Sequence, residues 1–166
     1  MVKEIINGIK YRLDEDKLTA EVIQKDEYKD CIIIPESVVF NELTYRVTSI
    51  GKNAFYGCES LTSITIPNSV TIIEDNAFHD CKKLSSITIP ESVEIIGDSA
   101  FAYCESLKVI AIPNSVKYIG DRAFSYCSSL AVITFQGAAP WMKGIGLGDD
   151  WHFGSPAKIT IIPTVL

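Results

Sequence analysis

The cysteines are the residues of this sequence whose chemistry could be most specific. Four of the five recur at intervals of 23 residues, at Cys58, Cys81, Cys104 and Cys127. A zinc site needs several ligands close together, as in a CxxC pair, and one cysteine per 23 residues does not supply them. Parallel strands lie ~4.8 Å apart, whereas the Cβ atoms of a disulfide lie about 3.8 Å apart. We therefore predict a column of small buried thiols.

Cys31 stands outside this column. Its position aligns with Ser63 and Ser86, which we expect to face outward. An outward thiol could be functional or could dimerise on oxidation.

Other residues that could do chemistry give weak patterns. The chain has two histidines, His79 and His152. Neither has a nucleophile or a paired acid at a spacing typical of a catalytic site. The segment GIGLG at 144–148 does not have the spacing of a phosphate-binding glycine loop. Asp149, Asp150 and His152 could be imagined as metal ligands, but a polar turn explains them better. We predict a protein that is not an enzyme and that uses no metal or other cofactor.

The cysteine column belongs to a longer repeat. The segments 61–83, 84–106 and 107–129 share apolar residues position by position, and an irregular unit at 31–60 precedes them. One column holds phenylalanine: Phe55, Phe78, Phe101 and Phe124. A single unit cannot bury its apolar face, and stacked units can, so a fixed period of this length predicts a solenoid.

Each repeat divides into the same elements. The segment SITIP alternates apolar and polar residues, which predicts a short strand that Pro67 ends. SVTII predicts a second short strand. In EDNAFHDCKKL the apolar residues fall at helical spacing, which predicts one or two helical turns. We expect right-handed winding, the default between parallel strands.

The two ends of the chain depart from the repeat. We predict a β-hairpin over residues 5–24 within an N-terminal cap at 1–30, and nine extra residues around VVFNELTYR within the first coil. The repeats end near residue 136. We predict a C-terminal cap at 137–166, with Trp141, Trp151 and Phe153 covering the last coil and a final strand at 159–163.

With these columns in view, the chain resembles the BspA-like leucine-rich repeat family over residues 31–136. One coil carries the match through Pro67, Ser69, Val70, Ile73, Ala77, Phe78, Cys81, Leu84, Ile87, Ile89 and Pro90. The resemblance implies a curved, β-rich solenoid of 23-residue repeats, with parallel strands and short helical turns. It also implies a bacterial surface or secreted protein that acts in adhesion by binding host proteins or other cells. No catalytic residues come with this family.

Composition limits the partners. The net charge of -6 disfavours nucleic acid, whose recognition needs clustered Lys and Arg. No apolar run approaches the ~18 residues of a membrane helix, so we predict no membrane insertion. The opening MVKEIINGIK lacks the apolar core of a secretory leader. A cytoplasmic location therefore stays open beside the cell-surface or extracellular one that the resemblance implies.

Two surfaces are candidates for binding. The first, which we call the strand face, consists of the outward positions of the main strands: Ser63, Thr65, Ser86, Thr88, Val109, Ala111, Val132 and Thr134. Stacked strands make such positions one continuous surface. Val109, Ala111 and Val132 form an apolar end that a protein covers or uses. The simpler explanation is that Ser, Thr and Val form strands well.

The second surface, which we call the aromatic corner, consists of Tyr56, His79, Tyr103 and Tyr126. Tyrosine is favoured at interfaces because it gives contact area at low entropic cost. Packing of each ring against the next coil is the alternative.

These features predict a recognition module that binds a protein or a glycan through a rigid solenoid surface. We expect a monomer. A self-assembling structural module is the first alternative, and an enzyme using the 136–158 loop is the second.

Overall fold

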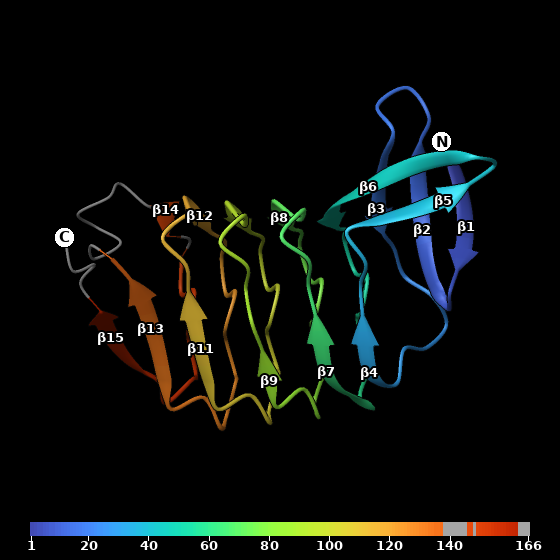
Figure 1. Ribbon diagram of the computed structural model, residues 1–166. Helices are drawn as coiled ribbons and strands as arrows, with labels where there is room; N and C mark the ends of the chain where they lie inside the picture. The colour runs from blue at the N-terminus through green and yellow to red at the C-terminus, as the bar shows by residue number, and fades with distance from the viewer. Residues whose placement is uncertain (138–145, 148, 163–166) are drawn as a thin grey trace.

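The computed structural model describes residues 1–137, 146–147 and 149–162. Its strands lie in two rows along one axis, with the N-terminal strands at one end and β15 at the other (Figure 1). The strands are β1 (Val2–Ile6), β2 (Ile9–Asp14), β3 (Thr19–Val22), β4 (Asp30–Ile33), β5 (Ser37–Phe40), β6 (Leu43–Ile50), β7 (Leu61–Thr65), β8 (Ile72–Ile73), β9 (Ser86–Ile87), β10 (Ile95–Ile96), β11 (Val109–Ile112), β12 (Tyr118–Ile119), β13 (Val132–Gln136), β14 (Gly146–Leu147) and β15 (Lys158–Ile162).

Parallel pairing between strands of successive coils builds both rows, with a break in the lower row between β9 and β11. The lower row in Figure 1 contains the sheets β4-β7-β9 and β11-β13-β15, and the upper row runs β3-β6-β8-β10-β12-β14. Equivalent residues of neighbouring coils pair directly, as Ile64 does with Ile87 and Ile110 with Ile133. The predicted solenoid of parallel strands is therefore confirmed.

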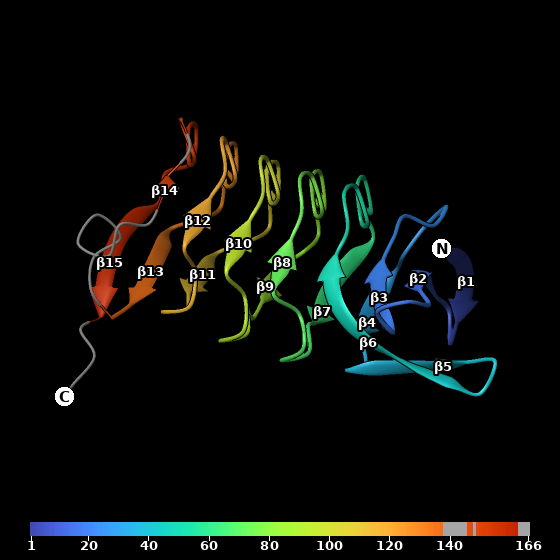
Figure 2. The ribbon, with the colours of Figure 1, turned by 90° about the horizontal axis from the view of Figure 1, so that it is seen from above.

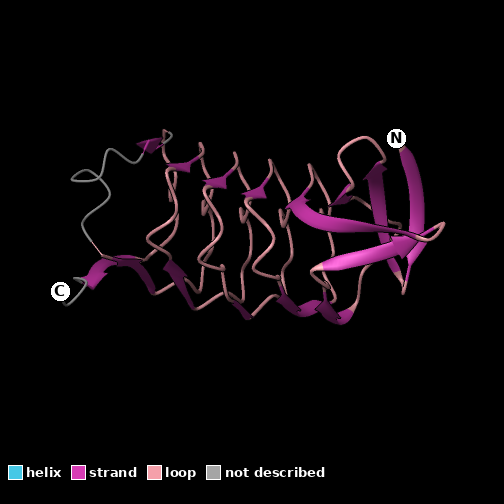
Figure 3. Ribbon diagram, turned by 45° about the horizontal axis from the view of Figure 1, so that its top comes forward, coloured by secondary structure: helices cyan, strands magenta, loops and turns pink. Residues whose placement is uncertain are grey.

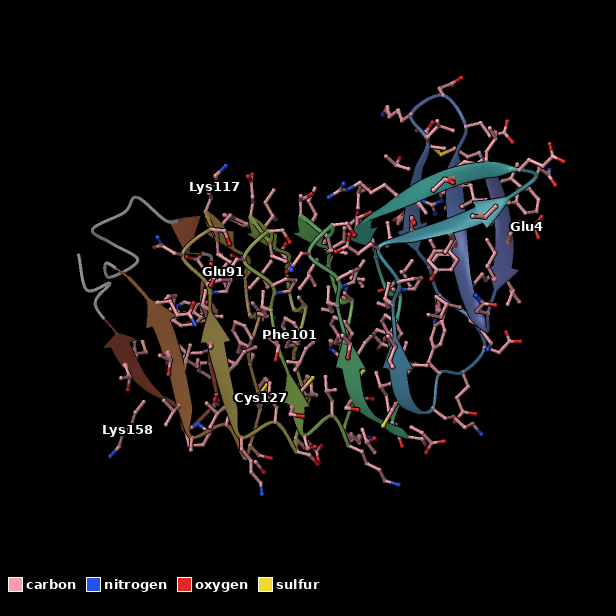
Figure 4. The ribbon with its side chains drawn as sticks, in the orientation of Figure 1. Glu4, Glu91, Phe101, Lys117, Cys127 and Lys158 are labelled. Carbon is pink, nitrogen blue, oxygen red and sulfur yellow. The ribbon has the colours of Figure 1, made fainter. Side chains whose placement is uncertain are left out.

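The core lies between the two rows. Phe55, Phe78, Phe101 and Phe124 are fully buried, and their rings stack with centroids 5.0 to 5.3 Å apart. The buried thiols lie beside this stack, and those of Cys81, Cys104 and Cys127 each donate a hydrogen bond to a phenylalanine carbonyl of the preceding coil. Cys104 Sγ donates to Phe78 O at 3.2 Å, and Cys127 Sγ to Phe101 O at 3.1 Å. Phe101 and Cys127 lie inside the coil stack in Figure 4. All five cysteines are free thiols.

The structure does not confirm the expected helical turns. Figure 3 shows strands and loops but no helix among the described residues. In the corner at 75–81 only alternate N–H groups bond within the coil, as Ala77 does to Glu74 O. The others donate to the next coil, as Phe78 N does to Ala100 O at 2.7 Å. The corner also contains two positive φ angles, 53° at Asn76 and 62° at Asp80. An α-helix cannot form here because half of the N–H groups bond to the next coil and because two residues have left-handed φ angles.

The N-terminal end begins with antiparallel strands. The hairpin expected over 5–24 contains β2 and β3, and β1 precedes it through a turn at Asn7 and Gly8. Both turn residues have positive φ, as a type I′ turn requires. β3 then pairs in parallel with β6 and so enters the upper row. The extra residues of the first coil form the hairpin β5–β6.

The C-terminal segment continues the coil pattern. β15 pairs in parallel with β13, and β14 pairs with β12. Trp151 is buried, and its ring meets Phe124 and Phe135 edge to face at 6.1 and 5.9 Å. Trp141, which we expected to take part in a cap, lies outside the described residues.

Candidate functional site

The strand face consists of columns in register. Ser63 pairs with Ser86, and Val109 with Val132. A second column pairs Ala111 with Thr134. Inward neighbours such as Ile64 and Ile110 are buried, so alternation turns these outward side chains away from the core. The result is a surface of short side chains on rigid backbone.

Exposure varies along this surface. Thr65, Ser86, Thr88, Val109 and Ala111 are exposed, whereas Ser63, Val132 and Thr134 are half-buried. Val109 is 53% exposed. The surface thus changes from hydroxyl-bearing to apolar toward the C-terminus.

The structure extends the strand face at both ends. Lys158 and Thr160 of β15 pair with Val132 and Thr134, and the side chain of Lys158 projects outward (Figure 4). At the other end, Ile33 pairs with Thr65 and is 74% exposed. Lys158 and Thr160 were missed because the last coil does not keep the 23-residue spacing.

The aromatic corner is one continuous ladder of rings. Tyr56 stacks on His79 with centroids 4.9 Å apart, and His79 meets Tyr103 at 5.3 Å. Tyr103 stacks on Tyr126 at 4.8 Å, and Tyr126 meets Phe153 edge to face at 5.7 Å. Figure 2 shows the corners that carry these rings following one another along the axis. The sequence pattern omits Phe153, which is 54% exposed.

Two tyrosines of the ladder have unusual backbone conformations. Tyr103 and Tyr126 have φ of 59° and 56°, in the left-handed region that favours glycine. Gly57 and Gly154 occupy the equivalent positions of the first and last corners, with φ of 67° and 69°. The chain therefore keeps bulky rings at positions where a side chain costs conformational energy.

His79 lies within the ladder between two tyrosines. It is half-buried, and its Nδ1 has no hydrogen-bond partner among the described residues. Burial lowers the pKa of His79 below its usual value, and the nearby carboxylate of Asp80 opposes this more weakly. The neutral imidazole is thus the form that the ladder holds.

The thiols fall into two electrostatic classes. Burial raises the pKa of Cys127 to about 12, and it raises the pKa of Cys104 well above its usual value. Hydrogen bonds with the hydroxyls of Ser63 and Thr62 lower the pKa of Cys31, which is exposed. Only Cys31 has both access to solvent and a favoured thiolate.

The groups considered for catalysis do not form a centre in the described part of the chain. No three His, Cys, Asp or Glu side chains there gather to hold a metal ion. Asp149 and Asp150 are exposed, and the segment 138–145 lies outside the described residues. Asp98 and Asp121 have a structural role, since Asp98 Oδ1 accepts the Asp121 N–H at 2.8 Å.

No helix among the described residues is long and apolar enough to cross a membrane.

With two rows of parallel strands and a stacked phenylalanine column in place, the family can be assigned. The sequence model described as "BspA type Leucine rich repeat region" matches residues 21–140 in six copies. The chain belongs to this family. Among proteins with curated descriptions, none matches this BspA-type repeat chain.

Solved structures share the fold. The T. pallidum leucine-rich repeat protein is 26% identical, with a TM-score of 0.61 over 84% of this chain and 78% of that one. The pneumococcal vaccine antigen PcpA is 22% identical, with a TM-score of 0.65 over 97% of this chain and 50% of that one. A leucine-rich cell surface protein from Faecalibacterium prausnitzii A2-165 is 22% identical, with a TM-score of 0.59, covering 99% and 55%.

The chain thus spans about half the length of the last two proteins.

Proposed function

We propose that this BspA-type chain is a non-enzymatic recognition module that binds a partner protein or glycan at a bacterial cell surface, as an adhesin does. The observation that carries the proposal is the strand face. Its outward columns stand in register within two parallel sheets, β4-β7-β9 and β11-β13-β15. A preformed surface of this kind loses little conformational freedom on binding.

The relatives favour the same role. One structural neighbour bears the description of a cell surface protein and another that of a vaccine antigen. Those descriptions belong to the neighbours, and we extend only the surface location to this chain. A host extracellular-matrix or cell-surface protein is the partner class that we favour.

A panel of immobilised matrix proteins, plasma glycoproteins and glycans tests the proposal. The test variant carries Thr65→Arg, Thr88→Arg and Thr134→Arg, which place three long cations on the strand face. The matched control carries Thr71→Arg, Ile95→Arg and Tyr118→Arg, which add the same charge at exposed positions in or beside the upper row. We expect saturable binding that the first variant weakens at least tenfold and the control leaves unchanged. Equal loss in both variants contradicts a strand-face site.

A second function, self-assembly, rests on a different observation. Val109 and Ala111 are exposed beside Val132, so the C-terminal half of the strand face presents apolar side chains together. If this surface joins copies, light scattering will show a mass that rises with concentration and that Val109→Lys reduces to that of a monomer. A mass independent of concentration contradicts this alternative.

A further inference from the structure

The strand β4 has one edge without a partner strand among the described residues. It is the first strand of the sheet β4-β7-β9 and pairs only with β7. Its other edge faces the N-terminal end of the molecule (Figure 1). An open edge presents backbone donors and acceptors that another extended chain can pair with.

The pairing with β7 identifies the free groups. Asp30 N donates to Ser60 O and Ile34 N donates to Thr65 O, both at 3.1 Å. Backbone groups of a strand alternate between its two edges. Since Ile34 is directed to β7, Ile33 and Cys31 direct their N–H and C=O groups to the open edge. These two residues therefore offer two donors and two acceptors at the spacing of a strand.

A cleft of about 490 Å³ lies along the same edge. Cys31, Ile32 and Ile33 line it on the β4 side, and the turn at Asn7 and Gly8 lines it on the other. Residues of the segment that leads from β3 to β4 also line the cleft, and Lys25 Nζ of this segment donates to Gly8 O at 2.9 Å. The volume falls in the range of small-molecule and cofactor pockets.

We propose that this cleft binds an extended peptide segment of a partner protein, which adds to β4 as a further strand. Its backbone pairs with the free groups of Cys31 and Ile33, and one apolar side chain packs on Ile33. Strand addition of this kind takes its affinity from main-chain hydrogen bonds and its specificity from side-chain pockets.

The charge and shape of the cleft indicate which kind of segment it binds. Lys25, Lys29 and Glu27 line the cleft. Because Lys29 pairs with Glu27 at 2.7 Å, Lys25 supplies the net positive charge of the lining on a chain of net charge -6. An acidic side chain beside the apolar one therefore suits the segment. A second copy is a poorer occupant, because the turn at Asn7 and Gly8 lines the cleft beside its own β4 as well. The site adjoins the strand face at Ile33 but uses the open backbone edge of β4, so it does not depend on the proposed adhesin role.

Amide hydrogen exchange of the whole chain tests the proposal. The probes are two acetylated, amidated peptides: LTSITIP, the sequence of residues 61–67 that forms the neighbour of β4, and DTSITIP, which adds an acid. At about 1 mM, the weak end of specific binding, we expect exchange at Cys31 and Ile33 to slow at least tenfold. We expect the acidic peptide to act at lower concentration. Unchanged exchange at both residues with both peptides overturns the proposal.

N-methylated peptides separate strand pairing from loose adsorption. One version is methylated at the positions of Ser63 and Thr65, and the other at those of Ile64 and Ile66. Because a single edge of the peptide meets β4, we expect one version to lose binding and the other to keep it. Loss in both, or in neither, overturns pairing at one edge.

A variant of the chain supplies an independent check. Ile33→Pro removes a free N–H and no hydrogen bond of the β4–β7 ladder, and proline is tolerated at sheet edges. We expect it to abolish peptide protection at Cys31, whereas Ile33→Ala retains it within threefold. Equal retention in both variants overturns the proposal. Should Ile33→Pro not fold, the N-methylated peptides decide.

Discussion

The rings of Phe101 and Phe124 lie 5.3 Å apart and within 2° of parallel, each from a different coil. Their stack is one of the buried apolar contacts between successive coils. Because both rings are fully buried, shortening one leaves a cavity between two coils.

Phe101→Ala should therefore lower the free energy of unfolding by about 3–5 kcal/mol. Thr88→Ala, at an exposed position of the strand face, should change it by no more than about 0.5 kcal/mol. Urea denaturation of both variants measures the difference. Similar small effects from the two would contradict the coil register described here.

The columns of equivalent residues could be predicted from the sequence because the repeats have a constant length. Each regular coil must place the same side chain at the same point, so Phe55, Phe78 and Phe101 could be aligned from the letters alone. The corners could not be predicted as turns, because apolar spacing there imitates a helix while half of the N–H groups bond to the next coil.

Other features were missed for identifiable reasons. The last coil lengthens the interval between equivalent residues, from 23 between Asp98 and Asp121 to 28 between Asp121 and Asp149. Phe153 could therefore be predicted as part of the C-terminal cap but not of the aromatic corner, and Lys158 could not be assigned to the strand face. The strand β1 did have a signal, the Asn7–Gly8 pair, which is typical of a two-residue hairpin turn.

Substitutions of Tyr103 can separate the contribution of its ring to stability from the cost of its left-handed backbone conformation. Glycine at this position loses the ring but accepts φ of 59°, whereas alanine loses the ring and keeps the strain. We expect Tyr103→Gly to be more stable than Tyr103→Ala by about 1 kcal/mol. Thermal denaturation of the two variants decides, and a more stable alanine variant would rule out the left-handed conformation.

His79 should make stability depend on pH. Its folded pKa lies below the usual 6.5, so the unfolded chain takes up the proton more readily. The contribution of His79 is then complete above pH 6.5 and is lost as the pH falls from 6.5 through the lower folded pKa.

The check is the urea midpoint between pH 7.5 and pH 5 for the wild type and for His79→Tyr, which preserves an aromatic ring. We expect the wild type to lose more stability than the variant over this interval. A smaller loss in the wild type would mean that His79 is stabilised as the cation.

Thiol titration should distinguish Cys31 from the buried column. An aromatic disulfide reagent at pH 8 should modify one thiol in the native chain and five after denaturation, since the other four cysteines are buried. Cys31→Ser should abolish the native reaction. Fast reaction of two or more thiols in the native wild type would contradict the buried ladder.

The most direct test of the central claim is binding of the reduced chain to the panel of matrix proteins, glycoproteins and glycans, measured for the wild type and the two triple-arginine variants. We predict saturable binding that only the variant with Thr65→Arg, Thr88→Arg and Thr134→Arg loses. Binding that this variant retains in full, with a correctly folded solenoid, would contradict recognition through the strand face.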